Sequence, residues 1–435
     1  MNRNLLLIVC MVLLIVAAAL MFYPDNESPR VLKFVIIAQV MFALSIALFA
    51  IGRKFDFDKR DRPLFYIVLV FAVVIRAVMF FGPGDSFWFS DDVYRYVWDG
   101  KVASHGVNPY LYSPRAGEVA HLVDTVIHPK INHAWLPTIY PPLAQYVFIA
   151  AYQLSGDSAW GFKLISAFFE LLTLLVLLVW FRQHGISRSH ILLWLFAPLV
   201  LIEFYMSAHI DILAMPFLVT TLIAAHDKRA GTTAIMLALA TLVKFYGLLF
   251  VPYILMEFRG RQRIRFIAVY LAFIVASYLP FAIDGRWAFL GSLFEYLSSW
   301  QFNASLFFVF KYVLGLSWAR HLAAGLLVLW LVYLFIRRLD LLQRMFGAMA
   351  GYIVLTTTLF PWYFVWMYPF LLRNLSPAFV FLSGSVLLSY HVHIGFYATG
   401  EWTPIIWTGL VEYIPFYALL ILFAVRKRRR SMLDA

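Results

Sequence analysis

Long apolar runs dominate the chain and determine its fold class. A helix of about 20 apolar residues crosses the hydrocarbon core of a membrane. The runs that approach this length are 5–22, 33–51, 64–81, 160–181, 190–206, 210–225, 265–281, 321–336 and 405–425. The pattern predicts an all-α protein, built as a polytopic transmembrane helix bundle.

Shorter apolar runs lie between several of the long ones. They cover residues 232–244, 247–256, 345–360, 363–372 and 377–389. Together with the long runs they predict about 13–14 membrane helices, some too short to cross a full bilayer.

Runs 232–244 and 247–256 are a special case, because basic residues flank the pair on both sides. Two half-length helices cannot each cross the bilayer, so the chain is expected to enter the membrane and return. Lys244 then lies at the turn, at membrane depth under the external face, where non-helical backbone must line protein or a wet cavity. A lysine at this depth usually pairs with an anion or lines a path. A salt bridge to Asp211 or another acid is the alternative, purely structural interpretation.

The composition excludes a soluble protein, since 63% of residues are hydrophobic and 13% are charged, with a mean hydropathy of +0.81. Soluble domains are about 45–50% apolar and about 25% charged. The net charge of +12 does not indicate nucleic-acid binding, because the basic residues gather in short loops between apolar runs. The single cysteine, Cys10, lies in an apolar run and excludes a disulfide framework or a thiol metal cluster.

The basic loops also predict sidedness. The basic residues lie in six loops or ends: 53–62, 182–188, 228–229, 259–265, 337–344 and 426–430. The positive-inside rule places these loops, and with them both termini, in the cytoplasm of a multi-pass cell-membrane protein. This assignment is consistent only if the apolar stretch 143–154 lies on the membrane surface as an interfacial helix. We therefore expect external segments at 82–158, 283–320 and 390–404. We divide the chain into two N-terminal spans, 1–63, and a larger membrane domain, 64–435.

An adjacent pair of acids, Asp91 and Asp92, follows the third long run. The residues after them have helical character, so that Asp91 shares a face with Arg95. Solvated charges at a helix N-terminus, favoured by the helix dipole, are one interpretation. However, the acids lie next to the membrane beside many aromatic residues, and a carboxylate with reduced hydration can act as a general base.

Other polar groups are expected on the same side. Glu203, His209 and Asp211 surround the turn in "EFYMSAHIDIL", where a helix cap is the alternative interpretation. Aromatic and amide side chains near the outer interface suit stacking on sugars, although interfacial aromatic belts are common. These are Trp300, Asn303, Trp362 and Tyr363. Two isolated histidines, His391 and His393, are a weak metal signal, and no metal site is expected.

Several functional classes leave no trace in the sequence. It has no internal repeat, which argues against the transporters that are built from repeats. It also has no phosphate-binding loop of the Walker type and no dinucleotide fingerprint. A soluble nucleotide bound at the cytoplasmic side is therefore not expected.

Five stretches together resemble the GT-C superfamily of integral-membrane glycosyltransferases. They are "DDVYRYVWDG…HGVNPY", "YPPL", "AHIDIL", "TLVKFYGLLFVPYIL" and "LFPWYFVWMYPFLL". Within the superfamily, the chain looks most like bacterial polyprenyl-phosphate-mannose-dependent mannosyltransferases, including those of the α-1,6-mannan type. The resemblance covers about residue 64 to the C-terminus and implies a GT-C-type bundle. The first two spans precede the usual first helix of the family.

The resemblance also implies a reaction. A hexose, expected to be mannose, moves from a polyprenyl-phosphate donor to a lipid-linked or polysaccharide acceptor on the external face, with inversion. The acid of the first external loop is the family's base, which corresponds to Asp91 or Asp92. Asp91 is preferred, although this chain has Asp where many relatives have Glu at the second place. No metal or cofactor is required, and membrane lipids surround the protein.

The remaining candidate residues follow from this reaction. The donor phosphate needs positive charge near the membrane surface, for which the candidates are Lys244, Arg95 and His209. The expected substrate contacts are Asp211, Tyr94, Asn108, Tyr140, Trp300, Asn303, Trp362 and Tyr363. The alternative functions are a transporter or flippase of lipid-linked sugars, and a lipid A or protein O-glycosyltransferase of the same fold. Arabinose, glucose and aminoarabinose are alternative sugars.

Overall fold

The computed structural model describes residues 2–23, 27–82, 90–285, 289–402 and 406–433. Most of these residues are helical, and they form no strand beyond an isolated bridge between Phe302 and Thr358. The all-α bundle predicted from the apolar runs is therefore confirmed. Residues 83–89, 286–288 and 403–404 of the expected external segments lie outside the described ranges.

Within the described ranges, eight helices are long and apolar enough to cross a membrane. They cover Arg3–Met21, Arg30–Gly52, Arg62–Phe81, Trp160–His184, Gly260–Ala282, Leu316–Ile336, Pro377–Tyr397 and Trp407–Arg426. The helices Arg188–Leu195 and Pro198–Met206 are long and apolar enough only when taken together, and they are bent by 50° at the break between them. By length and composition this pair is either a ninth, broken span or a re-entrant loop, and we refer to it as the broken span. Four further apolar helices are shorter: Ile210–His226, Ala230–Val243, Phe245–Leu255 and Leu341–Leu355. The run 210–225, expected among the long runs, is therefore a short helix, and the run 377–389, expected to be short, belongs to a full-length candidate span.

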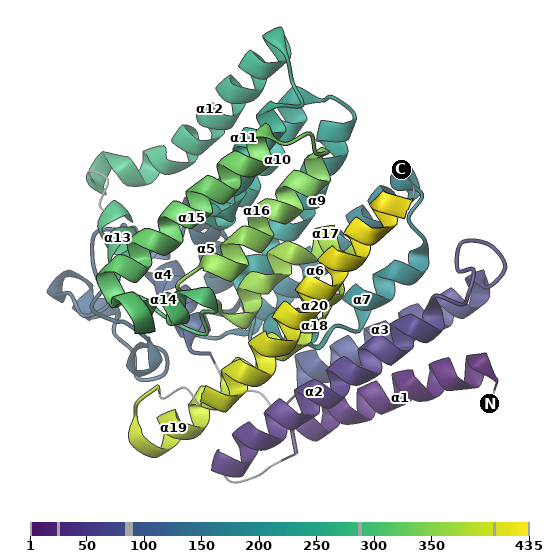
Figure 1. The fold of residues 1–435 in the computed structure, drawn as a ribbon. Helices are drawn as coiled ribbons and strands as arrows, with labels where there is room; N and C mark the ends of the chain where they lie inside the picture. Colours follow the sequence, from purple (N-terminus) through teal and green to yellow (C-terminus); the bar gives the residue numbers. More distant parts are fainter. Residues whose placement is uncertain (1, 24–26, 83–89, 286–288, 403–405, 434–435) are drawn as a thin grey trace.

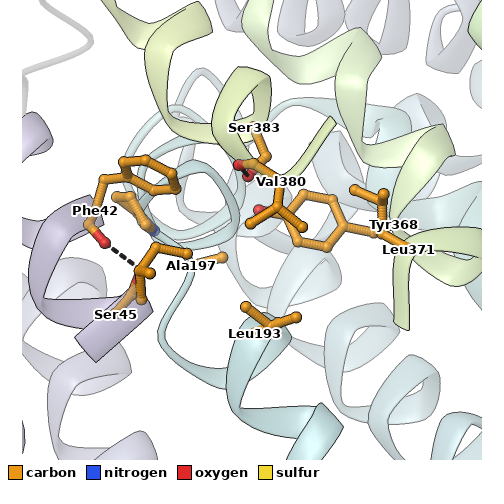
Figure 2. A pocket seen from close by; sticks show the side chains of 10 residues that line it. Phe42, Ser45, Leu193, Ala197, Tyr368, Leu371, Val380 and Ser383 are labelled. Carbon is orange, nitrogen blue, oxygen red and sulfur yellow. Dashed lines mark hydrogen bonds between the residues drawn. The ribbon is translucent and has the colours of Figure 1, made fainter. Parts of the chain in front are cut away.

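The two N-terminal helices, α1 (Arg3–Met21) and α2 (Glu27–Gly52), pack onto the rest of the bundle. In α2, the Gln39 amide donates a hydrogen bond of 3.1 Å to the carbonyl of Gly384. A small cavity of about 10 Å³ lies between α2 and the bundle, near Phe42 and Ser45. It has room for about one water molecule. In Figure 2 the Ser45 hydroxyl binds the Phe42 carbonyl of its own helix. The cavity is thus a packing defect with a satisfied hydroxyl.

The described part of segment 82–158, which the sequence predicts to be external, carries a helical hairpin. After α3 (Arg62–Phe81) come α4 (Asp92–Ser104), the short turns η1 (Gly117–Leu122) and η2 (His128–Lys130), α5 (Pro142–Ser155) and α6 (Trp160–His184). Helix α5 has 14 residues, a length of about 21 Å that is too short for a span. Helices α4 and α5 pack so closely that a Cβ added at Gly100 in α4 would collide with the backbone carbonyl of Phe148 in α5. The Lys101 ammonium ties this hairpin to Asp124 and Asp157, at 2.9 and 3.0 Å.

The broken span and the next helices surround the centre of the bundle. They are η3 (Arg188–Ile191), α7 (Leu192–Leu195), α8 (Pro198–Val200), the π-helix η4 (Leu201–Met206), η5 (Ile210–Ala214) and α9 (Met215–His226). Proline at 198 disfavours helical geometry at Ala197, which explains the break between α7 and α8. The described side chains of η4 and η5 are all buried.

The predicted re-entrant pair has the expected shape. Helix α10 (Ala230–Val243) ends one residue before Lys244, whose backbone is extended, and η6 (Phe245–Phe250) with α11 (Val251–Leu255) leads back. The ends of the pair meet, because the Lys228 ammonium lies 2.7 Å from the Glu257 carboxylate. Gly247 permits the turn, since a Cβ there would collide with Thr241.

The C-terminal part completes the bundle. Its elements are α12 (Gly260–Gly285), α13 (Phe289–Ser299), α14 (Leu306–Leu314), α15 (Leu316–Ile336), α16 (Leu341–Leu355), η7 (Pro361–Met367), α17 (Tyr368–Arg373), α18 (Pro377–Ser385), η8 (Val386–His391), α19 (Val392–Thr399) and α20 (Ile406–Leu433). The candidate span Pro377–Tyr397 continues into the segment 390–404, so helix occupies the first part of that expected loop.

The polar loops separate to opposite ends of the bundle. Figure 1 shows α4, α13, α14 and α19 toward one end, while the start of α1, the loop between α2 and α3, and the last turns of α20 lie toward the other. Two of the basic loops are directly joined, since Arg188 pairs with Asp58 at 3.3 Å. These basic loops, which the positive-inside rule assigns to one side of the membrane, therefore share one end of the molecule with the start of α1 and the last turns of α20.

A buried ion pair holds α3 against α6. The Arg76 guanidinium binds the Glu170 carboxylate through two hydrogen bonds of 2.7 and 3.2 Å, and both side chains are almost fully buried. The Trp194 indole and the Tyr205 hydroxyl donate to the same carboxylate, at 2.7 and 2.8 Å. A charge in a low-dielectric interior is tolerated when it is paired and hydrogen-bonded in this way.

Replacing one partner of this pair should destabilise the fold. Arg76→Met leaves the Glu170 charge buried without its cation, which costs about 3–5 kcal/mol of unfolding free energy. We expect a clear fall in Tm of the detergent-purified protein, partly recovered in the double variant Arg76→Met/Glu170→Met. The matched control is Arg60→Met, which removes an exposed pair with Asp61. A fall in Tm as large for Arg60→Met as for Arg76→Met would contradict this account.

Candidate active site

The acid pair lies at the start of α4 and is bridged by one amide. Asp91 is the N-cap residue and Asp92 the first residue of the helix. The Asn132 amide nitrogen donates to both carboxylates, at 2.7 Å to Asp91 and 2.8 Å to Asp92. Asp91 is exposed, whereas the Asp92 side chain retains 21% of its accessible surface. The two acids therefore face one side of the external segment, with Asp91 outermost.

Arg95 supports the loop that carries Asn132. Its guanidinium pairs with Asp99 at 2.8 Å and donates to the Leu136 carbonyl at 2.9 Å. The arginine is buried. The geometry gives Arg95 a structural task behind the acids, while its predicted contact with a donor phosphate stays a prediction.

The surroundings make both acids weaker than free aspartate. Although the Asp91 side chain is accessible, the protein packed around it and the charge of Asp92 raise its pKa to about 6, against the opposing hydrogen bond from Asn132. Burial also raises the pKa of Asp92, and Asn132, Lys244 and Tyr96 oppose that shift. The influence of Lys244 on Asp92 means that the re-entrant turn lies within electrostatic reach of the acid pair.

Lys244 is held in an ion pair at the turn of the re-entrant helices. Its ammonium lies 2.8 and 3.0 Å from the two oxygens of Asp211, and the Trp366 indole donates to the same carboxylate at 3.1 Å. The ammonium also lies over the Tyr363 ring, 3.9 Å from its centroid. The salt bridge of the purely structural interpretation is thus present. An ammonium has three donors, and the Lys244 side chain keeps 17% of its accessible surface.

His209 connects the two groups. Its Nε2 lies 3.9 Å from the Asp92 carboxylate and 2.8 Å from the Ser90 hydroxyl. Its ring stacks on Trp362 with centroids 3.7 Å apart, and Trp362 is followed by Tyr363, which lies under Lys244. A continuous set of contacts therefore runs from the acid pair to the lysine.

Aromatic rings line the outer side of the acid pair. Asn132 is followed by His133, whose ring lies 4.5 Å from Trp300 and 4.9 Å from Trp135. The Trp135 side chain is 54% exposed. Tyr94 contacts the ammonium of Lys130 at 5.0 Å. His133, Trp135 and Trp300 therefore form a rim of rings next to Asn132, which binds Asp91.

Other predicted substrate contacts are occupied by protein partners. The Asn108 amide donates to the Phe281 carbonyl at 2.8 Å, and the Asn303 amide donates to Glu412 at 3.0 Å. The Tyr140 ring lies 5.1 Å from Tyr96, which reaches Asp92 through its hydroxyl at 3.5 Å. Tyr140 is thus one residue removed from the acids. Substrate roles for these three residues stay predictions.

Sequence reasoning missed Asn132 and Ser90. Asn132 lies 40 residues beyond Asp92 in an irregular loop, where no periodicity marks a side chain that returns to the acids. Ser90 directly precedes the acid pair and resembles an ordinary helix-start serine. Only the folded loop shows what they contact.

Metal binding has no support from geometry in the described residues. Across those residues, no group of three or more histidine, cysteine, aspartate or glutamate side chains lies close enough to hold an ion. The expectation that no metal or cofactor takes part stays a prediction, which rests on the chemistry proposed below.

Comparison with known proteins identifies the family. Residues 10–259 match a family described as "Alpha-(1->6)-mannopyranosyltransferase, N-terminal domain", which covers more than half of the chain. The matched region contains the acid pair, His209, Asp211 and Lys244. No curated protein and no solved structure matches the chain. Members of such a family act on a sugar donor and a glycan or lipid acceptor. The chain belongs to this α-(1→6)-mannopyranosyltransferase family and is a multi-pass membrane mannosyltransferase.

Proposed function

We propose that the protein transfers mannose from a polyprenyl-phosphate donor to a lipid-linked or polysaccharide acceptor on the external face, with inversion. The observation that carries this proposal is the common site of the acid pair and Lys244. A carboxylate with a raised pKa and an ammonium at the membrane-embedded turn lie at the two ends of one connected group of side chains. Such a site suits a substrate whose sugar is polar and whose phosphate is attached to a lipid.

Asp91 is the base in this scheme. Its carboxylate takes the proton from an acceptor hydroxyl while that oxygen attacks the anomeric carbon. The bond from this carbon to the phosphate oxygen breaks on the opposite face, which inverts the configuration. A base works best when its pKa is close to the working pH, and the raised pKa of Asp91, about 6, meets this condition. Asp92 is more enclosed and supplies the charge that raises the pKa of its neighbour.

Lys244 is the cation for the departing lipid phosphate. A positive charge fixed where negative charge develops lowers the barrier most when little water is present. The Asp211 carboxylate and the Tyr363 ring hold the ammonium in place. One donor is left for a phosphate oxygen, so the scheme needs neither a metal ion nor a cofactor.

The exposed rings on the Asp91 side suit the acceptor. Trp135, His133 and Trp300 form a rim that a sugar can cover with its apolar face. The rim lies next to Asn132, which binds the base directly. The donor would then approach from the lysine side and the acceptor from the rim.

The distribution of charge supports an external location for the site. The basic loops lie at the end of the bundle opposite α4 (Figure 1), and positive loops stay in the cytoplasm. The termini are then cytoplasmic and the site is external.

A transporter or flippase of lipid-linked sugars is the competing function. Membranes containing the protein, supplied with labelled polyprenyl-phosphate mannose, should form a new covalent glycan. Movement of intact donor across the membrane without such a product would support the transporter. Matched assays with arabinose, glucose and aminoarabinose donors test the choice of sugar, and assays with lipid A or protein acceptors test the choice of acceptor.

Removing the base should abolish turnover without unfolding the protein. Asp91→Asn retains the size of the side chain and one oxygen that can accept from the Asn132 amide, but it cannot accept a proton. We expect transfer from the lipid-linked sugar to fall by about a hundredfold or more. The same assay on Asp92→Asn decides the division of labour between the acids. Near-normal rates in both variants, at unchanged Tm, would refute the base assignment.

The pKa of Asp91 predicts an acidic limb in the rate profile. The ionised carboxylate is the active form, so raising its pKa to about 6 means that activity is lost as the pH falls through 6. Below this value kcat/KM should fall about tenfold per pH unit. The residual activity of Asp91→Asn should not have this limb, and an identical limb in that variant would assign the titration to another group.

Lys244 can be tested separately from the ion pair that it forms. Lys244→Met should raise the KM for the donor because the phosphate loses its cation, but it also leaves Asp211 buried without a partner. The double variant Lys244→Met/Asp211→Asn removes that complication and serves as the comparison. We expect weak donor binding in both variants. Unchanged donor KM in the double variant would make Lys244 a structural residue only.

A further inference from the structure

Two irregular backbone features meet directly behind the acid pair. Residues Leu201–Met206 form a π-helix, and Ala208 has a positive φ of 55°. π-Helical turns are rare overall, but those that occur are often found at functional sites. A positive φ is unfavourable for a residue with a Cβ. Such local strain persists where the surrounding structure enforces it. Together the two features turn the chain back, so that the His209 amide donates to the Glu203 carbonyl at 2.9 Å.

This turn brings two buried side chains together. The Glu203 carboxylate lies 2.9 Å from Nδ1 of His209, and both side chains are fully buried. The Tyr390 hydroxyl, from η8, lies 2.8 and 2.9 Å from the two oxygens of Glu203. A buried carboxylate costs free energy unless it is paired, and ionisable residues inside a membrane bundle are usually functional. Glu203 has no place in the reaction scheme above, which leaves its task to be explained.

The His209 ring has little freedom to move. It stacks on Trp362 at 3.7 Å, and its Nε2 lies 2.8 Å from the Ser90 hydroxyl. Within the described part of the chain, Nδ1 meets the geometric criteria for a hydrogen bond with no group. The Glu203 oxygen 2.9 Å away is the polar neighbour on that side of the ring, and we assign the ring proton to Nδ1, facing it.

With this assignment, each donor faces the next group on the way from Asp92 to Glu203. With the proton on Nδ1 facing Glu203, Nε2 is an acceptor for the Ser90 hydroxyl hydrogen. The Ser90 oxygen in turn faces the backbone N–H of Asp92 at 3.4 Å. The contacts run from the first residue of α4, through Ser90 and His209, to the buried Glu203 carboxylate, one oxygen of which lies 2.9 Å from Nδ1 without hydrogen-bond geometry.

We propose that Glu203 is a positioning residue, which holds the acid pair in its working geometry through His209 and Ser90. The proposal rests on the proposed function, because it assumes that the acid pair supplies the base. In this proposal His209 orients Ser90 and Asp92, whereas the sequence alone suggests that His209 binds the donor phosphate. Glu203 itself does not touch substrate. Partners of this kind, one contact removed from the reacting groups, typically contribute about 10–100-fold to the function of a site.

Three variants separate this role from bulk stability. Glu203→Leu removes the acceptor, Glu203→Gln retains an acceptor oxygen without the charge, and His209→Phe retains the stack on Trp362 without either nitrogen. We expect kcat to fall about 10–100-fold in Glu203→Leu and His209→Phe, with the donor KM unchanged. Glu203→Gln should recover most of the rate. Because both residues act in one relay, Glu203→Leu/His209→Phe should be no slower than either single variant.

The pH profile gives a readout that a structural defect does not move. The charged or titratable groups around the acids are Lys244, Arg95, Tyr96, Tyr140, His209, Asp211 and Glu203 itself. Asp92 in turn raises the pKa of Asp91. If Asp92 loses its anchor and moves away, Asp91 loses a repelling neighbour. The acidic limb should then shift to lower pH in Glu203→Leu. The control is Ser389→Ala, whose hydroxyl binds only the Val386 carbonyl among the described residues; it should leave rate and limb unchanged.

Two outcomes would overturn the proposal. A Glu203→Leu protein with a lower rate but an unmoved limb would make Glu203 a purely structural residue. A raised donor KM with normal kcat in His209→Phe would return His209 to phosphate binding. Parallel measurement of the wild type and Asp91→Asn distinguishes these failures from a failure of the proposed function. If the proposed function fails, Asp91→Asn itself retains the wild-type rate. If only the role of Glu203 fails, Asp91→Asn is still inactive.

Discussion

A charge inside an apolar helix bundle must be paired, and this constraint organises the centre of the protein. Lys244 meets it with Asp211, and Arg76 meets it with Glu170. Each pair joins elements that are far apart in sequence, so the ionic contacts fix how the short helices and the broken span fit together. Because the Lys244 pair lies at the turn of the short-helix pair, the contact that stabilises the turn also joins Lys244, through Tyr363, Trp362 and His209, to the acid pair.

The acids depend on the same organisation. Asp91 and Asp92 belong to a hairpin that packs outside the long helices, and Asn132 bridges them from a loop that Arg95 supports. His209 then joins this external layer to the buried core through Ser90 on one side and Glu203 on the other. The site is therefore formed where the external segment meets the broken span.

Much of the fold could be predicted from the sequence, because apolar length and basic loops obey simple physical rules. The long spans, the short helix at 143–154 and the re-entrant turn at Lys244 all follow from the cost of placing charge or free backbone in hydrocarbon. The acid pair and Lys244 could be singled out for the same reason. The π-helix at Leu201–Met206 could not, since its sequence is as apolar as that of a regular helix. Asn132 was equally hidden, because loop contacts have no periodic pattern. The pairing of Arg95 with Asp99 was not foreseen either, since an arginine four residues after an acid has more than one acid within reach.

The central claim is that one site holds both the sugar and the lipid phosphate between Asp91 and Lys244. The most direct test is an experimental structure of Asp91→Asn bound to polyprenyl-phosphate mannose. The account predicts the phosphate at the Lys244 ammonium and the anomeric carbon facing residue 91, with the polyprenyl chain leaving toward the membrane. A donor bound elsewhere, with its phosphate out of contact with Lys244 and its sugar away from the acid pair, would contradict the account.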